Sequence, residues 1–259
     1  KKKWSPENYA KKFYGSVPTY YALKNSLNAS TALLGQTVGL DDIISTAKKL
    51  GVYSDLKAFP SLTLGAFEMY PIEALQTYTT IASLGQKVDL SFIRRVYDFK
   101  GMLVYEHVPT SQRVFDEVTS SILVGMLKQT TISGSAKSIG GSVLNIPVAG
   151  KTGTTNDYKD TWFIGMTPQK TALVWVGYDQ NGITGLTGAS GAVPVWSQYM
   201  NSALKDHPKI DFPFPEDKIQ RIVLDKEKLT RLNINLELEP DIAPFELIFD
   251  KDKVPSELK

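Results

Sequence analysis

Three extended stretches joined by tight turns limit the possible folds of this chain more than any other feature. The first, residues 143–155, is rich in small side chains, and the other two are residues 161–167 and 171–178. Asp157 and Asp160 lie in the first connection and Pro168 in the second, and both residue types are common in turns. Consecutive strands with such short connections pair as an antiparallel meander. We therefore expect a three-stranded antiparallel sheet over residues 143–178.

Helical patterns lie on both sides of the meander. Residues 22–51 predict two helices, the second beginning with Asp41 and Asp42 as cap and first-turn anions and ending at Gly51. Further helices are predicted at 66–84, opening with Pro71, at 114–130 and at 192–205. The last of these carries an apolar stripe of Val193, Trp196, Met200 and Leu204.

The remaining segments predict loops and short strands. Residues 1–21 are aromatic and turn-rich, which indicates an ordered loop. Residues 92–105 predict short strands around a turn at 98–101, and residues 232–239 alternate apolar and polar side chains like a half-buried strand.

Composition excludes several kinds of site. The 259 residues contain no cysteine, so a thiol nucleophile, a disulfide or a cysteine-ligated metal is excluded. The two histidines, His107 and His207, have no ligand spacing, so no metal site is expected. The longest apolar stretches fall far short of a membrane span.

Charge does not point to nucleic acid or to a membrane surface, because the net charge is only +2. It is unevenly spread. Residues 206–259 carry 9 Lys and Arg against 13 Asp and Glu, a net of −4, and the rest of the chain carries +6. This difference is either a chance asymmetry between two surfaces or a sign that the main part of the chain handles an anionic ligand.

The most informative segment is Pro147-Val-Ala-Gly-Lys151-Thr-Gly-Thr-Thr155. A phosphate-binding P-loop also contains Gly-Lys-Thr, but it requires glycine five residues before Gly150, where this chain has Asn145. It also requires a helix from the lysine onward, which the β-branched residues and glycine that follow disfavour. The P-loop interpretation is therefore the weaker one.

The KTG box of Lys151, Thr152 and Gly153 resembles the box that lines the active-site wall of penicillin-recognising serine enzymes. There Lys151 would place a cation beside a nucleophile and a substrate carboxylate, and the hydroxyls of Thr152 and Thr154 would bind that carboxylate. Gly153 would let a peptide lie against the strand edge as an added strand. A backbone N–H of the strand would stabilise a developing oxyanion. The alternative is a surface strand with an incidental lysine.

Ser26-Leu27-Asn28 supplies an S-x-N box upstream of the KTG box. Ser26 would relay a proton to a leaving amine, and Asn28 would donate a hydrogen bond to a substrate carbonyl. Read alone, the same residues would be an ordinary helix N-cap, because serine and asparagine are common there. The KTG box downstream favours the catalytic interpretation.

Taken together, these motifs resemble the transpeptidase domain of class A, bifunctional penicillin-binding proteins. The resemblance covers residues 1–205 and only loosely the acidic, partly β extension at 206–259. The matching residues are Trp4-Ser-Pro-Glu-Asn8-Tyr9, Ala22-Leu-Lys-Asn-Ser26-Leu-Asn28, Ala47-Lys-Lys-Leu-Gly51, Pro60-Ser-Leu-Thr-Leu-Gly65, Ile72-Glu-Ala-Leu-Gln-Thr-Tyr78, Ala149-Gly-Lys151-Thr-Gly-Thr-Thr155-Asn-Asp157, Lys159-Asp160-Thr-Trp162-Phe-Ile-Gly165, Leu186-Thr-Gly188 and Pro194-Val-Trp196.

The resemblance implies an α+β fold with a central, mostly antiparallel sheet flanked by helices. It implies D,D-transpeptidation of peptidoglycan stem peptides through a serine acyl-enzyme that β-lactams also acylate, with no cofactor. Ser26, Asn28 and Lys151 would be catalytic, and Thr152, Gly153, Thr154 and Thr155 would bind substrate.

The family's nucleophile, a serine in S-x-x-K upstream of S-x-N, has no match before Ser26. The S-x-x-K strings starting at Ser45, Ser54 and Ser256 all follow Ser26, and Ser45 with Lys48 is expected to face solvent. We therefore expect the nucleophile on an upstream part of the same protein, together with a glycosyltransferase domain and a membrane anchor that hold the site outside the cytoplasm. The helix that carries this nucleophile is expected to lie between Ser26 and Lys151. Loss of that helix is then expected to leave an apolar groove.

Two other functions remain open at this point. A serine β-lactamase-like hydrolase would share both boxes but would need a base for deacylation. A non-catalytic binding domain would need no nucleophile at all.

Overall fold

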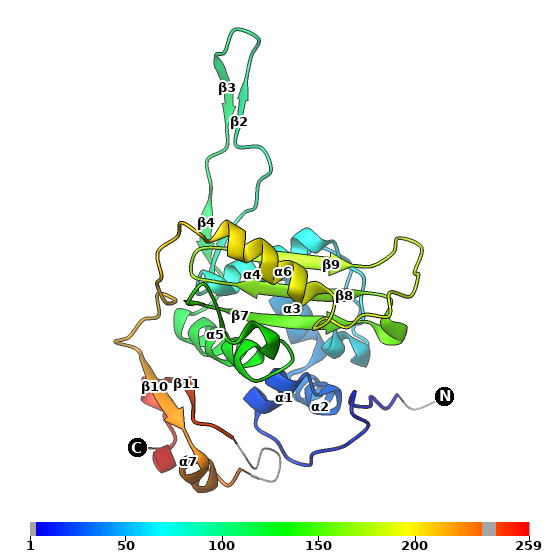
Figure 1. Cartoon of the computed structure of the whole chain (residues 1–259), viewed down its shortest axis with the longest axis vertical. Helices are drawn as coiled ribbons and strands as arrows, with labels where there is room; N and C mark the ends of the chain where they lie inside the picture. Colours follow the sequence, from blue (N-terminus) through cyan, green and yellow to red (C-terminus); the bar gives the residue numbers. More distant parts are fainter. Residues whose placement is uncertain (1–3, 235–241, 259) are drawn as a thin grey trace.

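A three-stranded antiparallel sheet lies at the centre of the computed structural model, which describes residues 4–234 and 242–258. Its strands follow one another as β7 (Ala149–Thr154), β8 (Thr161–Met166) and β9 (Thr171–Val176) (Figure 1). Lys151 of β7 lies opposite Ile164 of β8, which lies opposite Leu173 of β9. The expected antiparallel meander is confirmed.

The first stretch of the meander is shorter than predicted. Residues 142–147 form a small hairpin of β5 (Ser142–Val143) and β6 (Ile146–Pro147) before β7 begins. Leu144 and Asn145 make its turn with φ angles of 53° and 62°. Two consecutive positive φ angles fit the tight turns of two-residue hairpins, so the chain reverses where an unbroken strand was expected.

Helices cover both faces of the sheet. On one face, Trp196 of α6 (Ala192–Ala203) packs edge to face against Phe163 of β8, with ring centres 5.1 Å apart. On the other face, Met166 of β8 shares an apolar cluster with side chains of α4 (Pro71–Ala82) and α5 (Glu117–Ile132). The predicted stripe of α6 is buried, as expected, and the fold is α+β with a helix-flanked antiparallel sheet.

The N-terminal region contains three helices, and the prediction of two was wrong. They are α1 (Thr19–Asn25), α2 (Asn28–Val38) and α3 (Leu40–Leu50). Ser26 ends α1 in a left-handed conformation with φ 56°, and Gly39, with φ 99°, separates α2 from α3. Gly39 is the N-cap of α3, so Asp41 and Asp42 lie in its first turn without capping it, whereas Gly51 ends it as expected.

Helix α4 begins at Pro71, the residue expected to open it. The helix predicted over 66–84 is shorter than expected, because residues 66–70 are not helical. The buried carboxylate of Glu73 accepts hydrogen bonds from the backbone N–H groups of Tyr53, Ser54 and Tyr70 at 2.7–3.0 Å. Burial alone would raise the pKa of Glu73, but these bonds and the Ser54 hydroxyl lower it overall. Glu73 thereby ties the loop after α3 to the start of α4.

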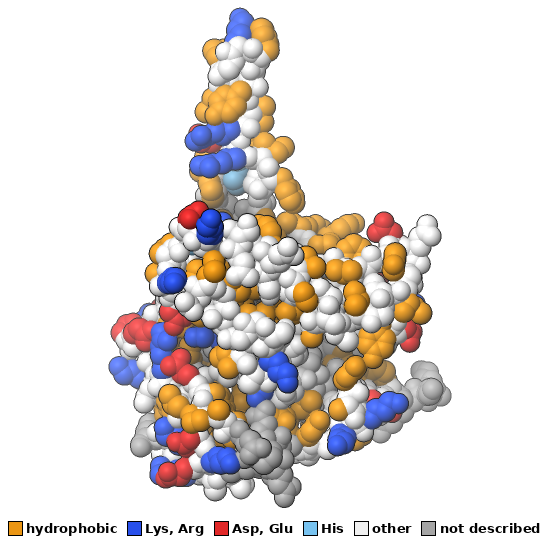
Figure 2. Space-filling model, viewed as in Figure 1, with side chains coloured by type: hydrophobic (Ala, Val, Ile, Leu, Met, Phe, Trp, Pro, Cys, Tyr) orange, Lys and Arg blue, Asp and Glu red, His pale blue; other side chains and the backbone are white. Residues whose placement is uncertain are grey.

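A long ribbon projects from the body between α4 and α5 (Figure 1). Strands β1 (Gln86–Val88) and β4 (Ser111–Arg113) form its base, and β2 (Arg95–Tyr97) and β3 (Leu103–Glu106) form its end. The predicted strands around 98–101 are confirmed. All residues of β2 and β3 are exposed, including several apolar ones (Figure 2).

The C-terminal extension is built differently from the prediction. It pairs β10 (Ile219–Leu224) with β11 (Phe245–Asp250), which pattern analysis missed, and carries α7 (Lys226–Arg231). The strand predicted at 232–239 is not found at residues 232–234, which turn away after α7, and its remainder lies outside the described residues. Ile219 and Ile248 of the pair share the cluster that contains Met166.

Neither a membrane span nor a metal cluster is found in the described part of the chain. No helix within residues 4–234 and 242–258 is long and apolar enough to cross a bilayer. Over the same ranges, no three acidic or histidine side chains gather as metal ligands would.

Candidate active site

The outer edge of β7, the side turned away from β8, is open for part of its length. Thr131 and Thr130 of α5 reach the carbonyls of Val148 and Gly150 on this edge, at 2.7 and 2.5 Å. Because every second residue of an antiparallel strand faces the same edge, the N–H groups of Thr152 and Thr154 also point outward. No described residue accepts a hydrogen bond from either N–H group. The edge is therefore free to pair with an added strand from Thr152 onward.

Lys151 lies beside this free edge and contacts Ser26 directly. Its Nζ donates to Ser26 Oγ at 2.6 Å and to the carbonyl of Thr152 at 2.8 Å, joining residues 125 positions apart. Burial lowers the pKa of the Lys151 amine to about 8. An amine with this pKa exists in both protonation states near neutral pH, so the pair is suited to passing a proton.

The direct contact corrects one expectation. A helix was predicted to separate Ser26 from Lys151, but the two side chains touch, because the left-handed end of α1 brings Ser26 within reach of the lysine from β7. A further catalytic segment would have to approach this pair from the side. Ser26 itself is exposed, so it is accessible from that direction.

Asn28 lies two residues after Ser26, as the first residue of α2. Its Nδ2 donates one hydrogen bond to the carbonyl of Glu7 at 2.8 Å. The amide carries two N–H donors, so one remains for a substrate carbonyl. The neighbouring Asn8 accepts a bond from Ala29 N at 3.1 Å, so the Trp4–Tyr9 segment holds the start of α2 in place. In the sequence, this segment indicates only the family resemblance and gives no sign of a structural role.

The hydroxyls of the KTG strand have partners within the chain. Thr152 Oγ1 donates to Ser135 Oγ at 2.8 Å, and Thr154 Oγ1 accepts from Gly188 N at 2.9 Å. Accepting this bond leaves the Thr154 proton available to a ligand, whereas the Thr152 proton is used. A Cβ on Gly188 would lie 2.8 Å from Thr152 Cβ, so the close approach requires glycine there.

Gly153 and Thr155 complete the predicted set. Gly153 is half-buried against Trp162, whose Cβ would lie 3.2 Å from a side chain added at Gly153. Thr155 is exposed, and its hydroxyl accepts from Asp160 N at 2.7 Å. Ser135 was missed by sequence reasoning, because a serine in a loop after a helix carries no distinguishing pattern.

None of the S-x-x-K strings forms a catalytic pair among the described residues. Ser45 and Lys48 are both exposed on α3, as expected. Ser54 donates to Glu73 at 2.6 Å, while Lys57 pairs with Asp55. Lys259, the partner of Ser256 in the third string, lies outside the described residues.

Comparison with known proteins identifies the family to which this chain belongs. Residues 1–200 match the family model for the penicillin binding protein transpeptidase domain. The chain belongs to this transpeptidase family. Within it, the chain is 37% identical over 214 residues to penicillin-binding protein 1B of Vibrio cholerae, which places it with the class A members. That match covers 82% of this chain and 27% of the relative, so the chain spans about a quarter of the relative's length.

Solved structures of transpeptidase proteins share the fold. Penicillin-binding protein 1A of Haemophilus influenzae superposes with a TM-score of 0.81 and 22% identity, covering 99% of this chain and 43% of that one. PonA1 of Mycobacterium tuberculosis, solved in complex with penicillin V, gives a TM-score of 0.72 and 22% identity, covering 80% of this chain and 61% of that one. At this identity the likeness establishes the fold alone.

Proposed function

We propose that this chain forms the KTG and S-x-N side of a D,D-transpeptidase site that cross-links peptidoglycan stem peptides. The observation that carries the proposal is the Lys151–Ser26 hydrogen bond beside the unpaired edge of β7. A peptide lying along Thr152–Thr154 as an added strand would bring its carbonyl next to this pair. Membership of the penicillin-binding transpeptidase family supports the same chemistry.

The proposed reaction has two acyl transfers. A serine hydroxyl attacks the carbonyl carbon between two D-alanines, a C–O ester bond forms, the C–N bond breaks, and D-alanine leaves with a proton relayed through Ser26 and Lys151. An amine of a second stem peptide then attacks the ester, forms a new amide and returns the hydroxyl. An outward N–H of β7 stabilises the negative charge on the carbonyl oxygen.

We propose that the attacking serine belongs to an S-x-x-K segment outside residues 1–259. Leu33, Leu34 and Val38 of α2 are exposed apolar side chains on a helix next to Ser26, which supports a further segment packing there. By analogy with class A relatives, the complete protein would also carry a glycosyltransferase domain and a membrane anchor, and the site would face the outside of the cytoplasmic membrane. β-Lactams would acylate the same serine.

The test is covalent labelling of the complete protein with a fluorescent penicillin. Lys151→Met and Ser26→Ala should each slow acylation at least a hundredfold. Lys48→Met is the matched control, because this exposed lysine on α3 belongs to one of the rejected S-x-x-K strings, and it should label like the parent. Fast turnover of the drug by the parent would favour the hydrolase, and absence of labelling would favour a binding domain.

A further inference from the structure

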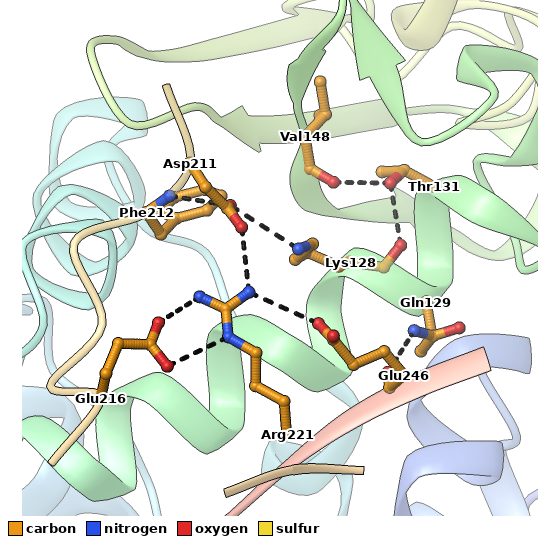
Figure 3. Close-up of polar contacts among 9 residues, drawn as sticks. All are labelled: Lys128, Gln129, Thr131, Val148, Asp211, Phe212, Glu216, Arg221 and Glu246. Carbon is orange, nitrogen blue, oxygen red and sulfur yellow. Dashed lines mark hydrogen bonds and ion pairs between the residues drawn. The ribbon is translucent and has the colours of Figure 1, made fainter. Parts of the chain in front are cut away.

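Four consecutive residues at the end of α5 face two different parts of the molecule. Lys128 and Gln129 contact the C-terminal extension, whereas Thr131 contacts the carbonyl of Val148 (Figure 3). Thr130 contacts the carbonyl of Gly150, the residue before Lys151. This turn of helix therefore lies between the extension and the KTG strand.

The two threonines hold β7 by its outer edge. Both are fully buried, and each hydroxyl lies 2.9 Å from a carbonyl of its own helix. The contacts to the strand are shorter, 2.5 Å from Thr130 to Gly150 O and 2.7 Å from Thr131 to Val148 O. A hydroxyl has one proton, so the shorter distances indicate that it is donated mainly to the strand.

This attachment ends where the free edge begins. Gly150 O is the last outward carbonyl held by α5, Thr152 O is held by Lys151 itself, and the outward N–H groups of Thr152 and Thr154 have no acceptor among the described residues. A shift of the Gly150 peptide would rotate the backbone that carries Lys151 and would change both its burial and its distance to Ser26.

The extension holds the same helix turn through a polar network. Gln129 Nε2 donates to the carbonyl of Glu246 on β11 at 2.8 Å, and Lys128 Nζ lies 3.7 Å from Asp211 Oδ1. Arg221 of β10 joins Asp211 at 3.1 Å, Glu246 at 3.6 Å and also Glu216 (Figure 3). The guanidinium thus links three acidic side chains of the extension beside α5.

We propose that Thr130 and Thr131 are positioning residues for Lys151 and the free edge of β7, and that Asp211, Arg221 and Glu246 of the C-terminal extension hold the helix turn that carries them. The proposal rests on the proposed function of that edge. It gives the extension a part in the reaction, although it lies beyond the family match, which ends at residue 200.

The first test removes one hydroxyl from the complete protein. Thr130→Val keeps the side-chain shape without the donor, and Thr130→Ser restores the donor. Thr80→Val is the matched control, because Thr80 is a fully buried helical threonine whose hydroxyl donates within α4. The readouts are the rate constant for acylation by a fluorescent penicillin between pH 6 and 10, and the melting temperature.

Thr130→Val should slow acylation at least tenfold at pH 7.5 and move the rising limb of the pH profile upward, because a less buried Lys151 regains a higher pKa. Thr130→Ser should return the rate to within threefold of the parent, and Thr80→Val should lower the melting temperature without changing the rate. Equal rates and pH profiles for Thr130→Val and Thr80→Val would overturn the positioning role. If the parent protein itself were not labelled by penicillin, that result would instead contradict the proposed function.

The second test addresses the extension. Arg221→Met should slow acylation at least threefold, whereas Arg231→Met, which breaks an exposed pair with Glu227 on α7, should not. An unchanged rate in Arg221→Met, with only a lower melting temperature, would show that the extension stabilises the fold without positioning the site.

Discussion

Replacing Lys151 with methionine should slow acylation by penicillin at least a hundredfold and yet make the folded protein more stable at neutral pH. The methionine keeps the length and apolar stem of the side chain but removes the amine. In the folded protein this amine is half-buried, and burial lowers its pKa from 10.5 to about 8. The fold therefore disfavours the lysine cation that is present at pH 7.

The size of the effect follows from the pKa. A pKa difference of one corresponds to about 1.4 kcal/mol, so holding the cation costs the folded state about 3 kcal/mol below pH 8. Methionine removes this cost but loses the hydrogen bonds to Ser26 Oγ and Thr152 O, worth about 1 kcal/mol each. The expected gain in the free energy of unfolding at pH 7 is about 1 kcal/mol.

The pH dependence has a definite sign. Between pH 8 and 10.5 the unfolded chain keeps a proton that the folded chain has lost, so the parent gains stability relative to Lys151→Met as pH rises. The gain should total about 3 kcal/mol and should be absent below pH 7. Comparing parent and variant at each pH cancels the titration of the other groups.

Urea unfolding of both proteins at pH 7, 8, 9 and 10 measures these differences, with Lys48→Met as the exposed-lysine control. A difference that does not change with pH would contradict the lowered pKa. The lowered pKa would also be contradicted if Lys151→Met were less stable than the parent by more than about 2 kcal/mol at pH 7, because the lysine would then be a net source of stability.

Three further predictions concern the scaffold. Glu73→Ala should lower the free energy of unfolding by about 3 kcal/mol in urea titrations, since three backbone N–H groups lose their acceptor, and the difference should shrink as pH falls below 4.5, because the folded carboxyl has a lowered pKa and protonation removes the stability linked to that shift. Gly165→Ala should cost about 1–3 kcal/mol in thermal unfolding, because its Cβ would lie 2.4 Å from Trp196 Cζ2, and an unchanged melting temperature would mean that the α6 face is loosely packed. Replacing residues 95–106 by a short Gly-Ser turn should change stability by less than about 0.5 kcal/mol, because both strands of the ribbon end are exposed; a larger loss in calorimetry would show that the ribbon supports the body.

Local pattern was sufficient for the elements with a clear period. The antiparallel meander, the buried stripe of α6 and the start of α4 at Pro71 all follow from alternation, helical spacing and the preference of proline for a first turn. Local sequence pattern gave wrong predictions where a residue adopts a backbone conformation that is unusual for its type, and where two paired strands lie far apart along the chain. The residue type serine gives no sign that Ser26 adopts φ 56°. Strands β10 and β11 pair with each other, but they lie too far apart along the chain for a short sequence window to contain both.

The sequence by itself determined the chemical groups of this protein: a lysine on a strand edge, a serine and an asparagine at a helix junction, and the order of the two boxes along the chain. Only the tertiary structure decided that Lys151 and Ser26 touch, that the N–H groups of Thr152 and Thr154 find no acceptor in the described part of the chain, and that α5 holds the edge beside them. The physical reason is distance along the chain. A hydrogen bond between residues 125 positions apart, and the burial that lowers the pKa of Lys151, depend on how helices and sheet pack, and no local preference encodes that packing.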